Sequence, residues 1–459
     1  MAGEPLVAGI DSSTQSTKVV LCRASDGTVV EEFSAPHPDG TECDPWHWLA
    51  ALEQGRELLE RASAVSVAAQ QHGMVALDSA GEVVRPALLW NDTRSAPQAA
   101  ALVAELGGPL EWASLAGSVP VASFTVTKLR WLAEAEPPHA ARTAAVLLPH
   151  DWLTWKLGSS GYVTDRGDAS GTGYWSPATG SYLPSIVAAA LGHEVELPRV
   201  AGPAETVGAT SWGAVLAPGT GDNMGAALGL GLAPGDVVVS IGTSGTAFAV
   251  SDVPAADPSG AVAGFADATG RFLPLVCTLN AARILSSTAT LLGCSLDELS
   301  ALALAAAPGA GGVTLLPYLD GERTPNRPGA SGVLRGLTTA NASRENLARA
   351  AVEALLCSLA DAVDHLVACG VSPRRVLLIG GGARSHAVRT LAPAIFGLPV
   401  TVPATGEYVA LGAARQAAWA LSGTLPDWPA PPAGEYDAVP DLHVRARYAA
   451  LRDDTVAWS

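Results

Sequence analysis

Two stretches of the chain repeat one pattern of apolar and polar positions. The first, VAGIDSSTQSTKVVL at 7–21, passes from an apolar strand through small polar residues at 11–17 into a second apolar strand. The second, VVVSIGTSGTAFAV at 237–250, does the same around a turn at 242–245. Short apolar runs separated by turn residues predict paired strands. Their spacing, about half of the 459-residue chain, indicates a weak internal duplication.

The rest of the pattern alternates strands with helices. Helical periodicity covers 46–61, and a strand is predicted at 65–69. Further along, a long helix is predicted at 341–369 and a buried strand at 376–379, which ends in three glycines. Strands that alternate with long helices form layered α/β structures. The pattern therefore predicts an α/β fold.

The length and the composition near residue 235 suggest how the chain is divided. At about 100–200 residues per domain, the chain can form two to four domains. The stretch Leu232-Ala233-Pro234-Gly235 has the composition of a hinge and precedes the second copy of the repeat. We therefore predict an N-terminal domain at 1–235 and a C-terminal domain at 236–459.

The overall composition excludes several classes of protein. Hydrophobic residues make up 48% of the chain and charged residues only 15%, which supports a large core rather than disorder. The formal net charge of −17 argues against a nucleic-acid partner and against a polybasic membrane contact. An acidic protein can still bind phosphate through backbone N–H groups and helix N-termini.

The sequence also carries expectations about where the protein works. The N-terminus leads directly into an apolar strand, so we expect no signal peptide. No apolar run reaches about 18 residues, so we expect no transmembrane helix. The six cysteines form no Cys-x-x-Cys pair, which favours reduced and mostly buried thiols in a cytoplasmic protein.

Several well-known motifs are missing from the sequence. The three lysines, Lys18, Lys128 and Lys156, lie outside any G-K-S/T motif, which argues against a P-loop. The H-R-D and D-F-G motifs of protein kinases and the H-E-x-x-H motif of zinc proteases are absent too. Any nucleotide site must therefore use a different arrangement.

The first repeated turn places a carboxylate at the end of a strand. Asp11 is followed by hydroxyl residues and then by Lys18. Such a turn can donate backbone N–H and hydroxyl groups to phosphate, with the carboxylate near a phosphate-bound Mg²⁺. An ordinary hairpin with a solvated Asp11 is the alternative. The turn at 242–245 favours phosphate binding, because two such turns could hold one nucleotide from both sides of a cleft.

Two further segments carry candidate chemistry. The glycines at 380–382 follow a buried strand and precede a helix, so a ligand could approach the backbone closely, although an ordinary turn is equally compatible. Asp222 stands at the start of a small-residue helix. There its carboxylate can stay ionised and orient a hydroxyl group for phosphoryl transfer. A simple N-cap role is the alternative for Asp222.

Polar residues that follow two other strands suit a polyol. Gln71 and His72 come after the strand at 65–69, and Trp90 with Asn91 follows another apolar run. Amide, imidazole and indole groups offer hydrogen bonds and an apolar platform to a sugar. A buried core histidine is the alternative for His72.

In order along the chain, these segments resemble the FGGY family of carbohydrate kinases, most closely its xylulokinase branch, over nearly the whole length. The sequence differs from the family pattern at Ser13, where glycine is usual, at Gln71, where some xylulokinases carry methionine, and at Tyr408 and Val409. The matching segments are Ile10-Asp11-Ser12-Ser13-Thr14-x-x-x-Lys18, Gln71-His72-Gly73, Trp90-Asn91-Asp92-x-Arg94, Gly221-Asp222-Asn223, Ser240-Ile241-Gly242-Thr243-Ser244-Gly245, Gly321-Glu322-Arg323-Thr324-Pro325 and Gly381-Gly382-Ala383-Arg384-Ser385.

The resemblance implies an actin-like ATPase fold, with two duplicated ribonuclease-H-like domains around a central cleft. It implies that D-xylulose is phosphorylated by Mg-ATP, with Asp222 as the general base and a sugar ligand and with Asp11 as a catalytic and Mg²⁺-binding residue. The other implied roles are sugar contacts at Gln71, His72, Trp90 and Asn223, and nucleotide contacts at Thr14, Gln15, Lys18, Thr243, Gly381, Gly382 and Ser385.

Other functions remain open at this point. A sister kinase could act on ribulose, glycerol, gluconate or another polyol. A non-catalytic sugar or nucleotide sensor is a second alternative, and an NAD-dependent oxidoreductase is weaker because the dinucleotide fingerprint is incomplete. The expected partners are a small sugar and ATP, with a homodimer considered and no nucleic acid or membrane expected.

Overall fold

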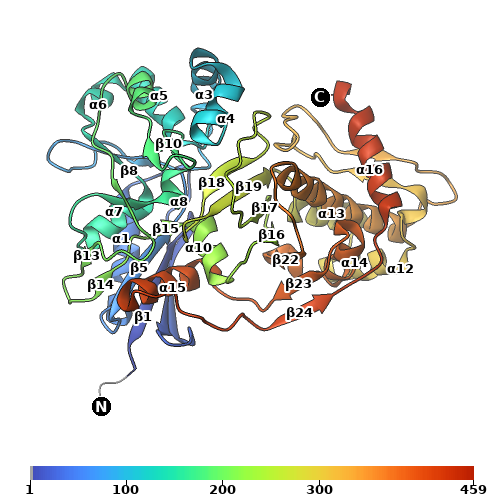
Figure 1. The fold of residues 1–459 in the computed structure, drawn as a ribbon. Coiled ribbons are helices and arrows are strands. Elements are labelled where there is room, and N and C mark those ends of the chain that lie inside the picture. Colours follow the sequence, from blue (N-terminus) through green and yellow to red (C-terminus); the bar gives the residue numbers. More distant parts are fainter. Residues whose placement is uncertain (1–3, 459) are drawn as a thin grey trace. The chain divides into compact units, whose positions relative to one another are not determined.

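The computed structural model describes residues 4–458, which fold into two compact units (Figure 1). The chain enters each unit several times rather than once. The first unit contains the chain up to Leu232, Asp252–Leu273 and Gly406–Ala430, and the second contains Ala233–Ser251, Pro274–Thr405 and the chain from Pro431 onward.

The first unit is built on a mixed sheet in the order β13-β14-β5-β1-β2-β3, with β15 also paired to β5. Strand β1 pairs antiparallel with β2 across a tight turn and parallel with β5 on its other side. The bounds are β1 Leu6–Ser12, β2 Ser16–Arg23, β3 Val29–Pro36, β5 Ala64–Ala69, β13 Gly208–Ala209, β14 Val215–Leu216 and β15 Thr220–Gly221.

The second unit repeats this local topology in its own sheet, where β19, β17, β16, β22, β23 and β24 follow in that order. Strand β16 pairs antiparallel with β17 and parallel with β22. The two repeated sequence segments thus fold in the same way. The bounds are β16 Asp236–Ile241, β17 Gly245–Ala249, β19 Phe272–Thr278, β22 Arg375–Ile379, β23 Val400–Pro403 and β24 Ala433–Tyr436.

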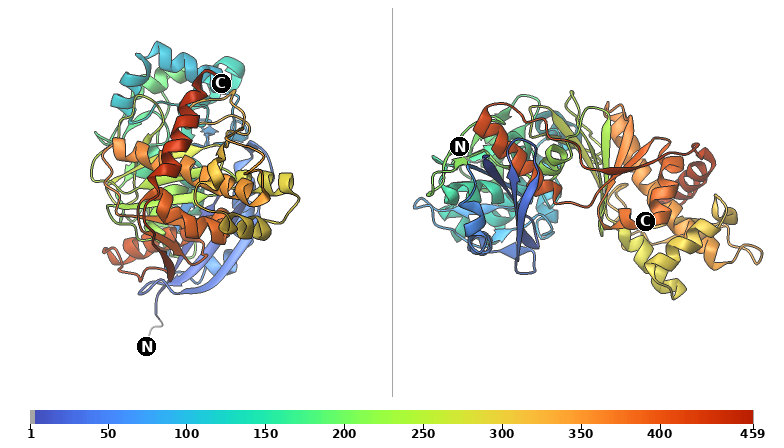
Figure 2. Two further views of the ribbon diagram at one scale, coloured as in Figure 1. Left: turned by 90° about the vertical axis from the view of Figure 1, so that its right-hand side faces the viewer. Right: turned by 90° about the horizontal axis from the view of Figure 1, so that it is seen from below.

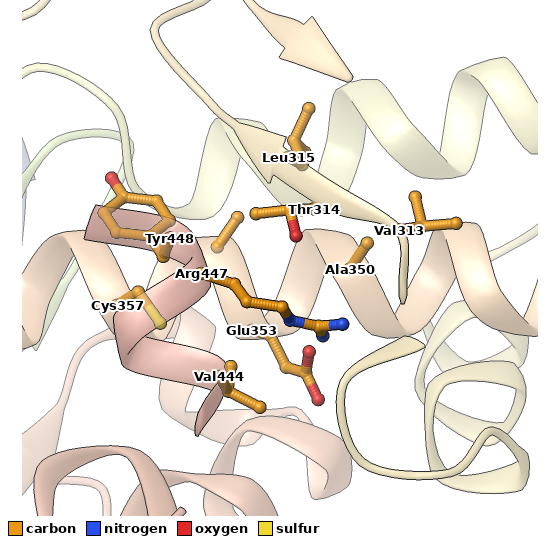
Figure 3. Close-up of a pocket in the computed structure, with 10 residues that line it drawn as sticks. Val313, Thr314, Leu315, Ala350, Glu353, Cys357, Val444, Arg447 and Tyr448 are labelled. Atoms are coloured by element: carbon orange, nitrogen blue, oxygen red, sulfur yellow. The ribbon is translucent and has the colours of Figure 1, made fainter. Parts of the chain in front are cut away.

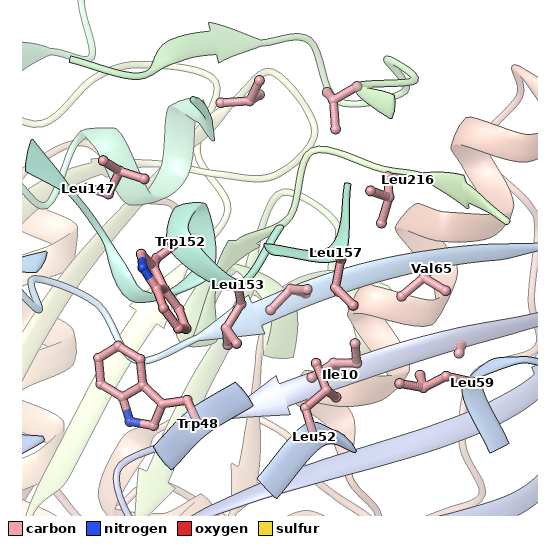
Figure 4. Close-up of a cluster of buried hydrophobic side chains, with 14 of the residues drawn as sticks. Ile10, Trp48, Leu52, Leu59, Val65, Leu147, Trp152, Leu153, Leu157 and Leu216 are labelled. Atoms are coloured by element: carbon pink, nitrogen blue, oxygen red, sulfur yellow. The ribbon is translucent and has the colours of Figure 1, made fainter. Parts of the chain in front are cut away.

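Helices cover the first sheet and bury its apolar face. Figure 4 shows part of this core, in which Trp48 and Trp152 meet edge to face at 6.5 Å between ring centroids. The same core buries Ile10 of β1 and Val65 of β5 completely. The helices of the first unit, not all of which lie on this sheet, are α1 Pro45–Glu53, α2 Arg56–Leu59, α3 Ala96–Glu105, α4 Gly108–Ala116, α5 Thr125–Ala135, α6 Pro137–Arg142, α7 Pro149–Leu157, α8 Arg166–Ala169, α9 Pro184–Leu191, α10 Asp222–Gly229 and α15 Tyr408–Ser422.

Short strands complete the first unit, and all of them pair in small two-stranded sheets except β18, which pairs with β19. They are β4 Glu42–Cys43, β6 Val75–Leu77, β7 Ala87–Leu88, β8 Ala145–Leu147, β9 Val163–Asp165, β10 Trp175–Ser176, β11 Ser181–Tyr182, β12 Arg199–Ala201 and β18 Ala263–Ala266.

The helix predicted at 46–61 is two helices, because the chain breaks at Gly55. Its backbone angles, φ −95° and ψ 13°, interrupt the α-helix between Glu53 and Arg56. A side chain at Gly55 would also lie 2.7 Å from the Phe33 ring. A larger residue at Gly55 would therefore force the Phe33 ring of β3 to shift.

The second unit centres on α13 (Arg344–Ala368), close to the predicted helix at 341–369. Its start is set by Ser343, whose Oγ accepts a hydrogen bond from the Asn346 N–H at 3.2 Å. The remaining elements are α11 Ala282–Leu292, α12 Leu296–Ala305, α14 His386–Phe396, α16 Leu442–Asp454, β20 Thr314–Leu316 and β21 Val333–Arg335.

Among residues 4–458, no single helix is long and apolar enough to cross a membrane. Helices α11 and α12 reach the required length and composition only as a pair, and that pair is bent by 88°. A small cavity of about 10 Å³ lies between α13, α16 and β20 (Figure 3), which is room for one water molecule. None of the residues predicted to bind a ligand lines it.

Helix α15 belongs to the first unit although it lies near the end of the chain. It packs on β1, β5 and α10, and Figures 1 and 2 show it beside the blue strands of the first sheet. The approach is close because the contact residues are small. A Cβ at Gly9 would lie 1.9 Å from the Ala410 carbonyl, and one at Gly412 would lie 1.8 Å from the Gly225 carbonyl. This segment lies within the predicted C-terminal domain at 236–459, yet it packs in the first unit.

Candidate active site

Three strand ends bring the predicted catalytic and sugar residues of the first unit to one edge of its sheet. Strands β1 and β15 both run parallel to β5 and flank it at neighbouring positions, with Ser12 and Gly221 each opposite Ala69. Asp11, Gln71 and Asp222 therefore lie at the carboxyl ends of adjacent parallel strands. Ligands in α/β sheets bind at this edge.

Asp222 is the first residue of α10, and its carboxylate is held by its neighbour. Asp222 Oδ1 accepts hydrogen bonds from the Asn223 backbone N–H at 2.7 Å and from Asn223 Nδ2 at 2.8 Å. Asn223 Nδ2 also donates to Gln71 Oε1 at 3.1 Å, which links Asp222 to the segment that follows β5. Enclosure by protein raises the pKa of Asp222 to about 6, against the lowering effect of these hydrogen bonds.

Asp11 is almost fully buried and carries an uncommitted oxygen atom. Within the described part of the chain, Asp11 Oδ1 has no hydrogen-bond partner. Burial and then the Asp222 charge raise the pKa of Asp11 to about 7, and the Lys18 charge opposes this. Two neighbouring carboxylates with an unused buried oxygen are a donor set that suits a hard divalent cation.

The first turn is shorter than predicted. Strand pairing continues through the polar residues, so that Asp11 lies opposite Lys18 and only 13–15 form the turn. Of the non-glycine residues that the structure describes, only His72 and Ala310 have a positive φ. Ser13 therefore fits the turn without the left-handed backbone that would strain a serine.

Two side chains of this turn already have partners. Thr14 Oγ1 accepts a hydrogen bond from Trp90 Nε1 at 2.7 Å, so a residue predicted for the nucleotide contacts one predicted for the sugar. Lys18 Nζ lies 2.6 Å from Glu407 Oε2 at the start of α15. Gln15 is exposed. Glu407 was missed because nothing in the local sequence marks a residue so far along the chain as a neighbour of Lys18.

The residues after β5 combine buried amides with a constrained histidine. His72 has φ 68°, and its Nδ1 lies 2.6 Å from the Gly171 carbonyl oxygen. Its ring packs against Phe124 at 4.8 Å between centroids. Gln70 is 1% exposed, yet neither of its amide atoms has a partner among residues 4–458, and Gln71 Nε2 has none either. Trp90, by contrast, is 42% exposed.

The predicted nucleotide residues of the second unit also gather after adjacent parallel strands. Gly380 follows β22 with φ +85°, and a Cβ there would lie 2.8 Å from the Ile241 carbonyl at the end of β16. A Cβ at Gly382 would lie 2.3 Å from the Ile241 side chain. Gly381 has open space around it, and Thr243 is exposed in the turn after β16.

Ser385 has a structural contact of its own. It is the N-cap of α14, and its Oγ accepts a hydrogen bond from the Val388 N–H at 3.4 Å. This cap orients the start of the helix that follows the glycine turn.

A cluster of buried ionisable residues lies next to Gly219, which precedes Asp222 by three positions. His150 Nδ1 is 2.6 Å from Asp168 Oδ2, and His150 Nε2 is 3.2 Å from Asp151 Oδ1. Burial alone would lower the pKa of His150, but the Asp151 and Asp168 charges raise it to about 9. These three residues are close enough to hold a metal ion. Because both ring nitrogens face carboxylates, a protonated imidazole satisfies the cluster without one.

Comparison with known proteins places the chain among carbohydrate kinases. Residues 6–229 match the model of the FGGY family of carbohydrate kinases, N-terminal domain, and residues 237–421 match its C-terminal domain. The chain is 50% identical over 439 residues to a protein of Streptomyces coelicolor named xylulose kinase, covering 91% of this chain and 89% of that protein.

Two solved structures extend the comparison to the fold. The crystal structure of xylulose kinase from Bifidobacterium adolescentis has a TM-score of 0.93 and 47% identity, over 98% of this chain and 99% of that one. Plasmodium falciparum glycerol kinase with ADP has a TM-score of 0.87 and 18% identity, over 99% and 98% of the chains. The predicted α/β, actin-like fold of two domains is confirmed, and the glycerol kinase shows that this fold does not decide the substrate.

Proposed function

Because this chain belongs to the FGGY family of carbohydrate kinases, we propose that it transfers the γ-phosphoryl group of ATP to the C5 hydroxyl of D-xylulose. Its activity as an ATP-dependent carbohydrate kinase follows from the family. The choice of D-xylulose is supported by the names of the relatives at 50% and 47% identity.

The observation that carries the proposal is the pair of carboxylates at one sheet edge. Asp222 is fixed by two hydrogen bonds from Asn223, while Asp11 keeps one buried oxygen without a partner among the described residues. Phosphoryl transfer needs a group to accept the hydroxyl proton and positive charge to neutralise the phosphates. The two carboxylates supply the proton acceptor directly, and they would hold a cation that neutralises the phosphates.

In the proposed reaction, Asp222 accepts the proton of the C5 hydroxyl. The C5 oxygen forms a bond to the γ-phosphorus as the bond between that phosphorus and the β,γ-bridging oxygen breaks. The products are D-xylulose 5-phosphate, ADP and the proton on Asp222, which is then released to solvent. An Asp with a raised pKa suits this task, because its basicity is closer to neutral pH.

Mg²⁺ is expected to accompany ATP in this reaction, and Asp11 would hold it. The bound ion would neutralise charge on the β- and γ-phosphate oxygens. Among the residues around Asp11, Thr14, Gln15 and Lys18 are proposed to contact the phosphates. In the second unit we assign Thr243 to the phosphates, and Gly381, Gly382 and Ser385 to the adenosine.

The sugar contacts are proposed to come from the end of β5 and its surroundings. Gln71 and Asn223 are already joined to each other and to Asp222, so a sugar bound there would reach the base. His72 adds an imidazole and Trp90 an exposed indole face. Buried Gln70, whose amide atoms have no hydrogen-bond partner among residues 4–458, is a further polar group for this site.

The decisive experiment is a substrate panel measured by ADP release in a coupled assay. D-xylulose is expected to give a kcat/KM at least about tenfold above L-ribulose, glycerol and gluconate, since such discrimination needs only one or two well-placed hydrogen bonds. Equal rates on any of these would overturn the sugar assignment and favour a sister kinase. No sugar-dependent ADP release at all would favour a sensor. The homodimer and the cytoplasmic location remain predictions.

A further inference from the structure

We propose that Gln416 and Asp165 are positioning residues for the Asp222 base, which hold the segment before it from two sides. Asp222 is preceded by Gly219, Thr220 and Gly221, and the first two of these make buried hydrogen bonds to side chains from distant parts of the chain. This inference rests on the proposed function only in taking Asp222 as the base.

Gln416 of α15 holds the backbone of Gly219 with both ends of its amide. Gln416 Oε1 accepts the Gly219 N–H at 3.1 Å, and Gln416 Nε2 donates to the Gly219 carbonyl at 3.0 Å. The Gln416 side chain is fully buried, and Ser66 Oγ of β5 fixes it further by donating to Oε1 at 2.6 Å. A buried amide with three hydrogen bonds has little freedom to move.

Asp165 holds the next residue from the opposite direction. The Thr220 hydroxyl donates to Asp165 Oδ2 at 3.0 Å, and both residues are buried. Asp165 also caps α8 by accepting the backbone N–H groups of Gly167 at 3.0 Å and Asp168 at 2.8 Å. The carboxylate is therefore fixed by three donors and cannot follow a shift of Thr220.

The cluster around His150 contacts both Asp168, which is bonded to Asp165, and Gly219. The backbone N–H of Asp168 donates a hydrogen bond to Asp165, and the Asp168 carboxylate in turn contacts His150. The distance between Asp168 Oδ2 and His150 Nδ1 is 2.6 Å. The His150 ring also lies directly under Gly219, where a Cβ would come within 2.4 Å of its Cδ2. Gly219 has φ +87°, which a side chain would strain in any case. The segment is thus bounded by packing as well as by hydrogen bonds.

These contacts matter for the base because Asp222 follows Thr220 by only two residues. Strand β15 consists of Thr220 and Gly221 alone, and its pairing with Ala68 and Ala69 of β5 is too short to set the position of Asp222 by itself. The hydrogen bonds from Gln416 to Gly219 and from Thr220 to Asp165 fix the position of this segment further. A misplacement of about 1 Å at a reacting group can lower a rate about 100-fold.

The first test removes the Thr220 hydroxyl without changing its shape. Thr220→Val keeps the volume, and Asp165 Oδ2 keeps its bond from Gly167, so no buried charge is left alone. We expect kcat with D-xylulose to fall about 10- to 100-fold. The KM for ATP should stay within about threefold of its original value. Thr220→Ser retains the hydroxyl and should recover most of the kcat.

The second test removes the amide on the other side. Gln416→Leu deletes both bonds to Gly219, whereas Ser66→Ala deletes only the bond from Ser66 to Gln416 and serves as its matched control. We expect the loss of kcat for Gln416→Leu to exceed that for Ser66→Ala by about tenfold or more. All variants are compared at a temperature where thermal unfolding shows them folded.

Hydrogen exchange of the peptide that contains Gly219 gives a readout independent of turnover. Exchange there should be faster in Gln416→Leu than in the original protein or in Ser66→Ala. If the protein released no ADP with D-xylulose, this difference would still test the anchor, and the proposed function alone would fail. Folded Thr220→Val and Gln416→Leu with kcat within about twofold of the original, or with unchanged exchange, would overturn the inference.

Discussion

Lys18 Nζ lies 2.6 Å from Glu407 Oε2, an ion pair between residues 389 positions apart in the chain. The Lys18 and Glu407 side chains are 32% and 39% exposed, so the pair contributes little stability, about 0–1 kcal/mol. Its importance is electrostatic. Glu407 lies close enough to raise the pKa of Asp11, and it holds the cation that we assign to the phosphates of ATP.

Replacing Glu407 should therefore tighten ATP binding. In Glu407→Gln, Lys18 no longer has a carboxylate competing with the phosphates, and we expect the KM for ATP to fall about two- to fivefold at low salt. The measurement is ADP release against ATP concentration. Glu205→Gln, which removes an exposed ion pair with Arg199 in the same unit, is the control and should leave KM unchanged. A higher KM in Glu407→Gln would mean that the pair positions Lys18 for ATP.

Asp222→Asn should remove the base while keeping the hydrogen bonds from Asn223 possible. General bases contribute about 10²- to 10⁴-fold, so we expect kcat to fall by that factor. Binding of a non-hydrolysable ATP analogue, measured by calorimetry, should be nearly unchanged. If the variant kept most of its turnover, Asp222 could not be the base.

The dependence of kcat/KM on pH should follow the ionisation of Asp222. Burial raises the pKa of Asp222 to about 6, so the group is protonated and inactive below that pH and ionised above it. We expect kcat/KM to be level above pH 7 and to fall about tenfold per pH unit below about pH 6. Rates measured from pH 5 to 8 at saturating Mg²⁺ would show this, and a flat profile down to pH 5 would contradict it.

Asp11→Asn should make the protein less active at a given Mg²⁺ concentration but more stable. Burial and the Asp222 charge raise the folded-state pKa of Asp11 to about 7, far above its unfolded value near 3.8. The folded protein therefore loses stability as pH rises from about 4 through 7, and the variant escapes this loss. Without Mg²⁺, its Tm should exceed that of the original protein, and by more at pH 8 than at pH 5.

Activity is the matching readout for Asp11. The Mg²⁺ concentration for half-maximal rate should rise by at least about tenfold in Asp11→Asn, as is typical when a group around a metal is lost. A lower Tm in the variant at pH 8 would show that Asp11 is structural and not a poised metal ligand.

The close packing of α15 predicts an unusual outcome for a glycine-to-alanine change. In a helix this change normally stabilises by about 1 kcal/mol. At Gly412 the new Cβ would lie 1.8 Å from the Gly225 carbonyl, so we expect destabilisation of about 3 kcal/mol or more. Gly202→Ala, at a position with open space and ordinary φ, should change stability by less than about 0.5 kcal/mol. Urea denaturation of both variants gives the comparison.

The sequence pattern predicted those features that are set by neighbouring residues. The strand pair at the start of each unit, the helix that begins at Asp222 and the long helix α13 all depend on residues within a few positions of one another. The short length of the first turn was not predicted, because Ser12 and Thr17 are polar. Both are nevertheless fully buried and pair with each other as strand residues. The break at Gly55 was not predicted, because the helical periodicity continues across it.

The site could be predicted as a set of residues but not as a set of contacts. Each candidate residue lies in a local motif, and its role in the site stays a prediction. Glu407 and Gln416 lie on a helix whose contact with β1, β5 and α10 spans most of the chain. No local periodicity marks such a contact, which is why neither residue entered the predicted site.

The position of α15 has a consequence for how the protein is made. The N-terminal part of a chain usually folds first as it leaves the ribosome. Here the face of the first sheet that packs on α15 cannot be covered until residues 408–422 have been synthesised, after most of the second unit. Until then the side of β1 that packs on α15, where Gly9 contacts Ala410, stays open to solvent and to chaperones. A nascent or truncated chain that stops at residue 235 would carry Asp11 and Asp222 without the helix that fixes them.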